Sequence, residues 1–364
     1  MVTIETLERL ADKYGLPLED VLFIALNFSG VNFSCDFNRM RMGFRLDESD
    51  EFAYAGNRGV LDYYFALAVN KSSDFAVDGD KLLLSGKRVG AVINPSEDFC
   101  DSHYPRRGGT VLNLNPNQRT SCRGCKFCYT GYQIPRDRKR IACADDLKAF
   151  LDGWLRENSL VDLSGLIQVA VVTGCYEAEE DLKNFILVLR KVLNYYRFGG
   201  EIFYLGSQIT DERSLKDLQE INPFGYCVSL ECFERRQGLL RDVKNKLELK
   251  RAFELMALAE QLGFRVNFSY VLGLENLAVV ARHLADTLRV INSFPIFNII
   301  QIHKYHSREI LAVQAQDLEY FLKARDNIEK VFINTVLRPR VWENYRSPWY
   351  LKFADEELIG VRTP

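Results

Sequence analysis

Apolar residues recur at strand-like and helical spacings along most of the 364-residue chain. Six apolar runs alternate with longer amphipathic segments in its middle part. The runs span residues 110–115, 166–174, 201–210, 225–233, 264–275 and 297–306. Apolar runs that alternate with helical patterns are typical of βαβ units, in which parallel strands are joined by right-handed crossovers. The pattern predicts an α/β protein with six parallel strands that can curl into a partial barrel.

The first thirty residues show a helical pattern instead. Apolar side chains between Leu7 and Tyr14 share one face of a helix, and Gly15 ends it. A second helix follows at residues 17–28. The pair is either a DNA-reading helix-turn-helix or a plain helical hairpin. We interpret it as a plain hairpin, because the second helix has no Lys or Arg to meet phosphates.

These changes of pattern predict three parts of the chain. Residues 1–105 form a smaller N-terminal α+β accessory domain, with a β-hairpin at residues 81–94. Residues 106–310 form a (βα)6 partial TIM barrel of parallel strands. Residues 311–364 form a C-terminal helix and an aromatic, basic tail that packs on the barrel. The tail, residues 338–353, either closes the barrel or lines its substrate site by stacking and charge.

Composition and charge narrow the classes of function. The formal net charge is -2, so no broad positive field favours nucleic acid, and we expect no nucleic-acid partner. The N-terminus has acidic residues where a signal peptide would be basic, and no apolar run reaches the roughly 18 residues of a membrane span. We therefore expect a cytoplasmic protein without a membrane partner. Nine cysteines in a reducing compartment are unlikely to form a disulfide framework, and the clustered ones are better interpreted as metal ligands.

Three of these cysteines, Cys122, Cys125 and Cys128, stand in one short loop. A structural zinc site needs four ligands, and no second Cys pair or nearby His pair supplies the rest. A ferredoxin run would place a fourth Cys and then Pro at the positions of Tyr132 and Gln133. The remaining interpretation is an oxygen-sensitive [4Fe–4S] cluster with three thiolate ligands, whose fourth iron is open to a cofactor or substrate.

The loop resembles that of the radical S-adenosylmethionine (SAM) superfamily. In that family the loop follows the first strand of a partial barrel and usually reads C-x3-C-x-aromatic-C. The stretch from Cys125 to Cys128 matches the second half, with Phe127 as the aromatic residue. The first gap differs, because two residues rather than three separate Cys122 from Cys125. The resemblance covers about residues 108–306.

The resemblance also implies which residues contact SAM. The family has a Gly-Gly-Glu-type turn after strand two, which meets the amino group of SAM, and the matching turn here begins at Gly174. Polar residues after strand four hold the ribose or carboxylate, and a glycine after strand five lies near the adenine. The implied cofactor residues are Phe127, Gly174, Cys175, Tyr176, Glu177, Ser229, Glu231 and Gly273.

The resemblance further implies a chemistry. A flavodoxin- or ferredoxin-type reductant would give one electron to the cluster, and SAM would split into methionine and a 5′-deoxyadenosyl radical. The radical would abstract hydrogen from a substrate held across the barrel. Two alternatives stay open: a non-catalytic iron–sulfur binding or sensing protein, and a radical SAM enzyme that modifies RNA. The outcome of the reaction is not specified by the sequence.

Polar residues at two strand ends suggest the substrate class. Ser207 and Gln208 end the third run, and period-two alternation places Gln301 and His303 on one face of the sixth. Amides, a hydroxyl and an imidazole suit a polar small molecule or a peptide better than a hydrocarbon. His303 is either a substrate contact or a hydrogen-bonded rim residue.

Overall fold

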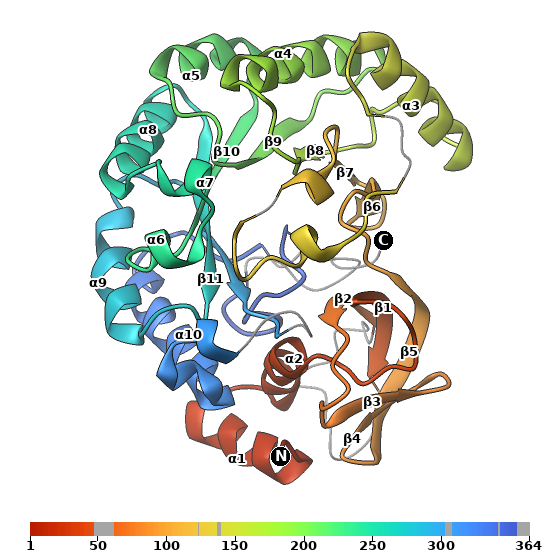
Figure 1. Ribbon diagram of the computed structural model, residues 1–364, viewed down its shortest axis with the longest axis vertical. Helices are drawn as coiled ribbons and strands as arrows, with labels where there is room; N and C mark the ends of the chain where they lie inside the picture. The colour runs from red at the N-terminus through yellow and green to blue at the C-terminus, as the bar shows by residue number, and fades with distance from the viewer. Residues whose placement is uncertain (47–61, 123, 137–139, 303–307, 341–342, 355–364) are drawn as a thin grey trace.

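A curled seven-stranded sheet and a five-stranded antiparallel sheet form the frame of the protein (Figure 1). The structure is a computed structural model, and it describes residues 1–46, 62–122, 124–136, 140–302, 308–340 and 343–354. One hydrophobic core cluster extends through both sheets and the helices around them.

The seven-stranded sheet carries the six predicted runs. Its strands are β6 (Tyr104–Arg106), β7 (Val111–Leu114), β8 (Gln168–Val171), β9 (Glu201–Gly206), β10 (Phe224–Glu231), β11 (Arg265–Leu272) and β12 (Ile296–Ile299). Their order is β12-β11-β10-β9-β8-β7-β6. Strands β7 to β12 pair in parallel, and β6 joins the edge antiparallel to β7. The structure confirms the mixed α/β class and a curled parallel sheet.

Helices cover the outer side of this sheet. They are α3 (Ala144–Glu157), α4 (Glu179–Tyr195), α5 (Glu212–Leu218), α8 (Leu249–Gln261), α9 (Leu277–Thr287) and α10 (Leu318–Phe332). Two short helices, α6 (Arg236–Leu239) and α7 (Asp242–Asn245), precede α8. Every residue of β8 and β10 is buried, as expected for parallel strands covered on both faces. Among the described segments, no helix combines the length and apolar composition that a bilayer crossing needs.

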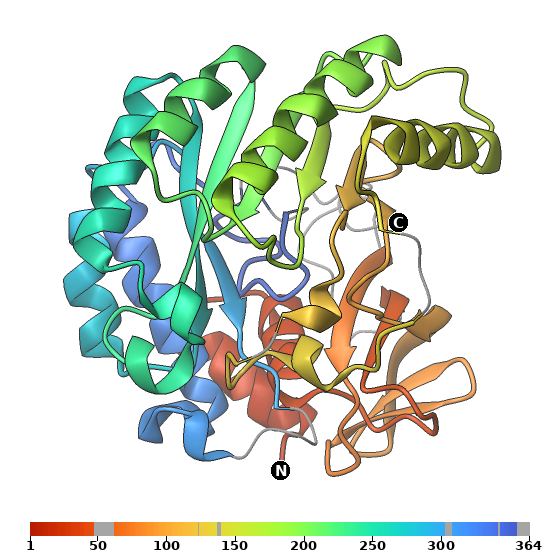
Figure 2. The same ribbon diagram turned by 45° about the horizontal axis from the view of Figure 1, so that its top comes forward.

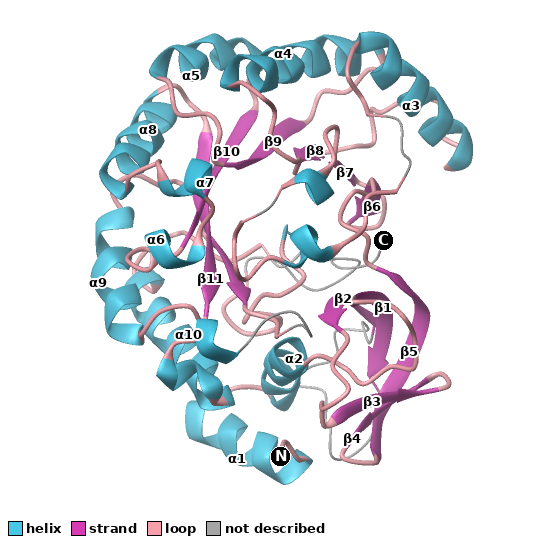
Figure 3. Ribbon diagram, in the orientation of Figure 1, coloured by secondary structure: helices cyan, strands magenta, loops and turns pink. Residues whose placement is uncertain are grey.

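The N-terminal part folds as a helical hairpin beside the antiparallel sheet (Figure 3). Helix α1 (Ile4–Tyr14) ends at Gly15, whose φ of 59° is left-handed, as predicted. Helix α2 (Leu18–Ser29) is buried along most of its length, which leaves it no exposed face to enter a DNA groove. The strands are β1 (Arg39–Leu46), β2 (Asp62–Ala68), β3 (Phe75–Asp78), β4 (Lys81–Leu84) and β5 (Lys87–Glu97). Strands β4 and β5 form the expected hairpin.

A buried carboxylate joins α2 to the C-terminal tail. Asp20, fully buried, forms an ion pair of 2.9 Å with Arg325 of α10, which is 1% exposed. Its oxygens also accept hydrogen bonds from the backbone N–H groups of Tyr350, Leu351 and Lys352. The predicted accessory domain is therefore tied to the last described segment of the chain. Its boundary at residue 105 stays a prediction.

We expect Asp20→Ala to lower the free energy of unfolding by about 3–5 kcal/mol, because it removes one of the two carboxylates paired with the buried Arg325 cation and the acceptor of three backbone N–H groups. Denaturant unfolding of the full chain measures this. As a matched control, Asp12→Ala removes an exposed carboxylate from α1 and should change stability by less than about 0.5 kcal/mol. Similar small losses for both variants would contradict the role of Asp20.

Candidate functional site

A cavity of about 120 Å³ lies at the carboxyl ends of the parallel strands. We call it the cysteine cavity. The loop that carries the three cysteines crosses the inner side of the curved sheet, as the gold and yellow segment in Figures 1 and 2 shows. The predicted residues that line the cavity are Cys122, Cys125, Phe127, Cys128, Cys175, Ser207, Gln208, Ser229 and Glu231. Parallel strands bring their carboxyl ends to one edge, which gathers these residues from distant parts of the chain.

Several thiols in this cavity form hydrogen bonds with neighbouring side chains. Cys128 Sγ lies 3.0 Å from Thr130 Oγ1, and the Cys122 thiol hydrogen-bonds to Cys175. Among the described residues, no three Cys, His, Asp or Glu side chains stand in the arrangement of a metal site. The assignment of Cys122, Cys125 and Cys128 as ligands stays a prediction. What the structure provides is their place along one cavity.

Three cations that the sequence analysis missed also line the cysteine cavity: Arg119, Arg241 and Lys244. Arg241 Nη2 donates to Cys175 Sγ, and its Nε is buried without a hydrogen-bond partner among the described residues. Lys244 Nζ lies 2.5 Å from Glu231. Nearby cations favour deprotonated thiols. The donor set and its surroundings therefore fit an anionic metal–thiolate group.

The Cys122–Cys175 pair already shows this effect. The hydrogen bond from Cys122, and next the charge of Arg241, lower the pKa of Cys175 to about 6, although burial opposes the shift. The same hydrogen bond, together with burial, raises the pKa of Cys122 well above its ordinary value. The arrangement therefore favours the thiolate form at Cys175 over the thiolate form at Cys122.

The turn after β8 is held against the loop that leads to the cysteines. Gln208 Oε1 accepts from the Tyr176 N–H and its Nε2 donates to the Tyr176 carbonyl, both at 2.9 Å. The Gly174 N–H donates to the Asn117 carbonyl at 3.0 Å. A Cβ at Gly174 would lie 2.0 Å from the carbonyl oxygen of Gln118. Glycine is needed here because two backbone segments touch.

Several predicted residues lie away from the cysteine cavity. Glu177 is exposed, and the Tyr176 side chain is buried beside α4. Gly273 packs against α10 and the residues after β12. Strand β12 ends at Ile299, so strand alternation does not extend to Gln301, whose Nε2 donates to a carbonyl of β2. His303 lies outside the described residues.

A second cavity, of about 200 Å³, adjoins the first. We call it the inner cavity. Phe127, Cys128 and Glu231 line both cavities. Side chains from the inner face of β7 to β12, from β1 and from residues 343–346 complete its lining. In the tail, Trp349 is in the core, while Tyr345 and Arg346 line this cavity next to the cysteines. Closure of the barrel and lining of a substrate site by the tail both stay predictions.

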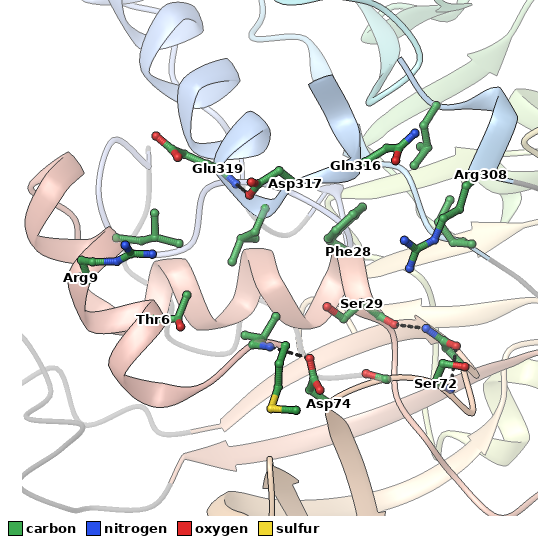
Figure 4. Close-up of a pocket in the computed structure, with 18 residues that line it drawn as sticks. Thr6, Arg9, Phe28, Ser29, Ser72, Asp74, Arg308, Gln316, Asp317 and Glu319 are labelled. Carbon is green, nitrogen blue, oxygen red and sulfur yellow. Dashed lines mark hydrogen bonds between the residues drawn. The ribbon is translucent and has the colours of Figure 1, made fainter. Parts of the chain in front are cut away.

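A larger cavity, of about 590 Å³, lies elsewhere (Figure 4). It lies between α1, α2, the turn around Asn70 and the segment before α10, and no cysteine lines it. Its polar groups make structural bonds: the Val2 N–H donates to Asp74, and Asn70 donates to the Ser29 carbonyl. Volume alone therefore does not identify the candidate site, because the clustered thiols line the smaller cysteine cavity.

Comparisons with known proteins give low similarities. No family model and no curated protein matches the chain. It is similar to Streptococcus suis SuiB bound to S-adenosylmethionine (TM-score 0.43, 14% identity, 64% of this chain and 49% of that one). It is also similar to a radical SAM methyltransferase from Sphaerobacter thermophilus (TM-score 0.41, 12% identity, 93% of this chain and 93% of that one). A third similar structure is the radical SAM enzyme HemN from Escherichia coli (TM-score 0.40, 15% identity, 60% of this chain and 51% of that one).

The solved structures that resemble this chain therefore include radical SAM enzymes. The chain spans about half the length of SuiB.

We expect Gly174→Ala to lower the free energy of unfolding by about 1–3 kcal/mol, because the added methyl group meets the Gln118 carbonyl. The same change at Gly153, which lies in α3 with nothing near its Cβ position, should raise stability by about 0.5–1 kcal/mol. Denaturant unfolding compares the two variants. Equal effects would show that the turn does not need close backbone contact.

Proposed function

We propose that this chain is a radical SAM enzyme that binds a [4Fe–4S] cluster through Cys122, Cys125 and Cys128 and acts on a polar small molecule or peptide. One observation carries the proposal. Three thiols from one nine-residue stretch line the same cavity at the carboxyl ends of parallel strands, beside three cations. A structural zinc site usually takes four ligands from paired Cys or His motifs, whereas this loop supplies three thiols and no second pair.

When bound, the cluster supplies one electron from a flavodoxin- or ferredoxin-type reductant to SAM, which splits into methionine and a 5′-deoxyadenosyl radical. Arg241 and Lys244 offset the charge of the thiolates that hold the cluster. Ser229 and Glu231 offer a hydroxyl and a carboxylate to the polar groups of SAM. Gln208 fixes the backbone of the turn that faces the cofactor.

The sheet and the N-terminal part would frame the site. The six parallel strands act as a (βα)6 partial TIM barrel, and residues 1–105 act as an accessory domain that closes its open side. Phe127 lies between the cysteine cavity and the inner cavity, since it lines both. The substrate then occupies the inner cavity, next to the cofactor. The protein would work in the cytoplasm with its thiols reduced.

We expect each of Cys122→Ala, Cys125→Ala and Cys128→Ala to lose most cluster iron and all formation of 5′-deoxyadenosine. The measurement is anaerobic reconstitution with iron and sulfide, followed by dithionite and SAM, with iron analysis and detection of 5′-deoxyadenosine. Cys143→Ala is the matched control, because Cys143 is exposed and lies outside the cysteine cavity.

Two outcomes would contradict the proposal in different ways. Full iron content in all three variants would remove the ligand assignment. Normal cluster formation in the wild type without any 5′-deoxyadenosine would favour the alternative of an iron–sulfur binding or sensing protein.

A further inference from the structure

We propose that the inner cavity binds its substrate by an anionic group, a carboxylate or a phosphate, held by Arg346 and Arg106. This inference rests on the proposed function, because it assumes that the molecule bound in the inner cavity is the substrate of a radical SAM reaction. It adds the chemical class of that substrate. The inner cavity adjoins the cysteine cavity through Phe127, Cys128 and Glu231. A molecule in it would lie next to the cofactor.

The charges that line the inner cavity do not balance. Five arginines line it: Arg39, Arg41, Arg106, Arg119 and Arg346. Of the acids, Asp98 is paired with Arg39 and Arg41 of β1, at 2.9 and 2.5 Å. Glu231 is paired with Lys244, and Glu343 with Arg265 at 3.1 Å. The acids are thus already matched, and three arginines are left without a carboxylate among the described residues.

Arg119 and the other two unmatched arginines differ in position. Arg119 lines both cavities, and its charge interacts with the Cys128 thiol. It is therefore the one best placed to offset cluster thiolates. Arg106 and Arg346 line the inner cavity and not the cysteine cavity. Their positive charges therefore favour binding of an anion in the inner cavity.

Arg346 is the clearest case. Its backbone is fixed, because its carbonyl accepts from the Ile299 N–H at 2.8 Å and its own N–H donates to Asn344. Its guanidinium has no hydrogen bond or ion pair among the described residues. Burial, and next repulsion from Arg39, lower the pKa of Arg346 to about 10. A bound anion would relieve both effects.

Unpaired donors surround the same space. Arg39 Nε, Arg106 Nε, Asn113 Nδ2, Ser269 Oγ and Tyr345 Oη are buried without a hydrogen-bond partner among the described residues, and all five residues line the inner cavity. Buried polar groups are nearly always paired in native proteins, so such a group of donors indicates a missing ligand. Nitrogen donors outnumber acceptors, and arginine suits carboxylates and phosphates because its donors form a fixed fork.

The test is calorimetric titration of the full chain with succinate, with inorganic phosphate and with succinamide, the neutral counterpart of succinate, at constant ionic strength. We expect succinate or phosphate to bind the wild type, and succinamide to bind at least about tenfold more weakly. Whichever of succinate and phosphate binds more tightly shows whether the site prefers a carboxylate or a phosphate. Arg346→Gln and Arg106→Gln should each weaken that binding about tenfold or more, and Arg346→Lys should weaken it less.

The control is Arg156→Gln, which removes an exposed arginine of α3 and should leave binding unchanged. Thermal unfolding of each variant verifies that it is folded. If Arg346→Gln does not fold, Arg106→Gln provides the test of binding. Binding that does not distinguish succinate and phosphate from succinamide would overturn the inference. So would unchanged binding in both glutamine variants.

Titration in the presence of saturating SAM separates the substrate from the cofactor. Independent binding supports a substrate site, while competition would assign the arginines to the carboxylate of SAM and overturn the inference. The titrations are run both before and after reconstitution with iron. Because anion binding needs no 5′-deoxyadenosine, a failure here and a failure of the proposed function give different results.

Discussion

The Asp20 carboxylate fixes the segment on which the shape of the inner cavity depends. It accepts three backbone N–H groups of the tail and faces the Arg325 guanidinium in a fully buried position. Arg325 in turn donates to the carbonyls of Pro348 and Lys352. A buried charge is costly unless it is paired, so loss of Asp20 would leave Arg325 with Glu329 as its remaining carboxylate. Helix α2 and residues 350–352 are thereby joined, and the nearby residues 343–346 line the inner cavity.

Charge pairing then explains how two adjacent cavities can hold different groups. In the cysteine cavity, Arg241 and Lys244 lie beside thiols, and nearby cations favour the deprotonated form of a thiol. In the inner cavity the acids are already paired with arginines or with Lys244. Under the two proposals above, the same kind of side chain favours thiolates on one side and a ligand anion on the other.

Glu231 stands where the two cavities meet. Its φ of 66° lies in the left-handed region, which is uncommon for a residue other than glycine. Its pairing with Lys244 and its position at the end of β10 hold it there. Strained residues of this kind concentrate at functional sites, because the surrounding structure has to fix them. The backbone conformation places one carboxylate at the boundary between the cysteine cavity and the inner cavity.

The pattern of apolar and polar residues along the chain was enough to predict much of the fold and part of the candidate site. Apolar runs predicted the parallel strands, and Gly15 predicted the end of α1 because glycine alone enters the left-handed region freely. Since parallel strands end at one edge, Ser207, Gln208, Ser229 and Glu231 could be expected near the cysteine loop, and they line its cavity. The end of β12 was misjudged, because an apolar run continues past the last strand hydrogen bond.

The tertiary structure alone decided which cations meet the site. Arg39 lies on a separate antiparallel sheet, Lys244 on a short helix, and Arg346 on a tail without regular structure. No periodicity connects such residues, because their distance in space depends on how whole elements pack and on the Asp20 contact to the tail. The sequence by itself determined the strands and the thiols. The packing of the two sheets and the tail determined the charges around them, because charges far apart along the chain approach only when burial of apolar surface brings their elements together.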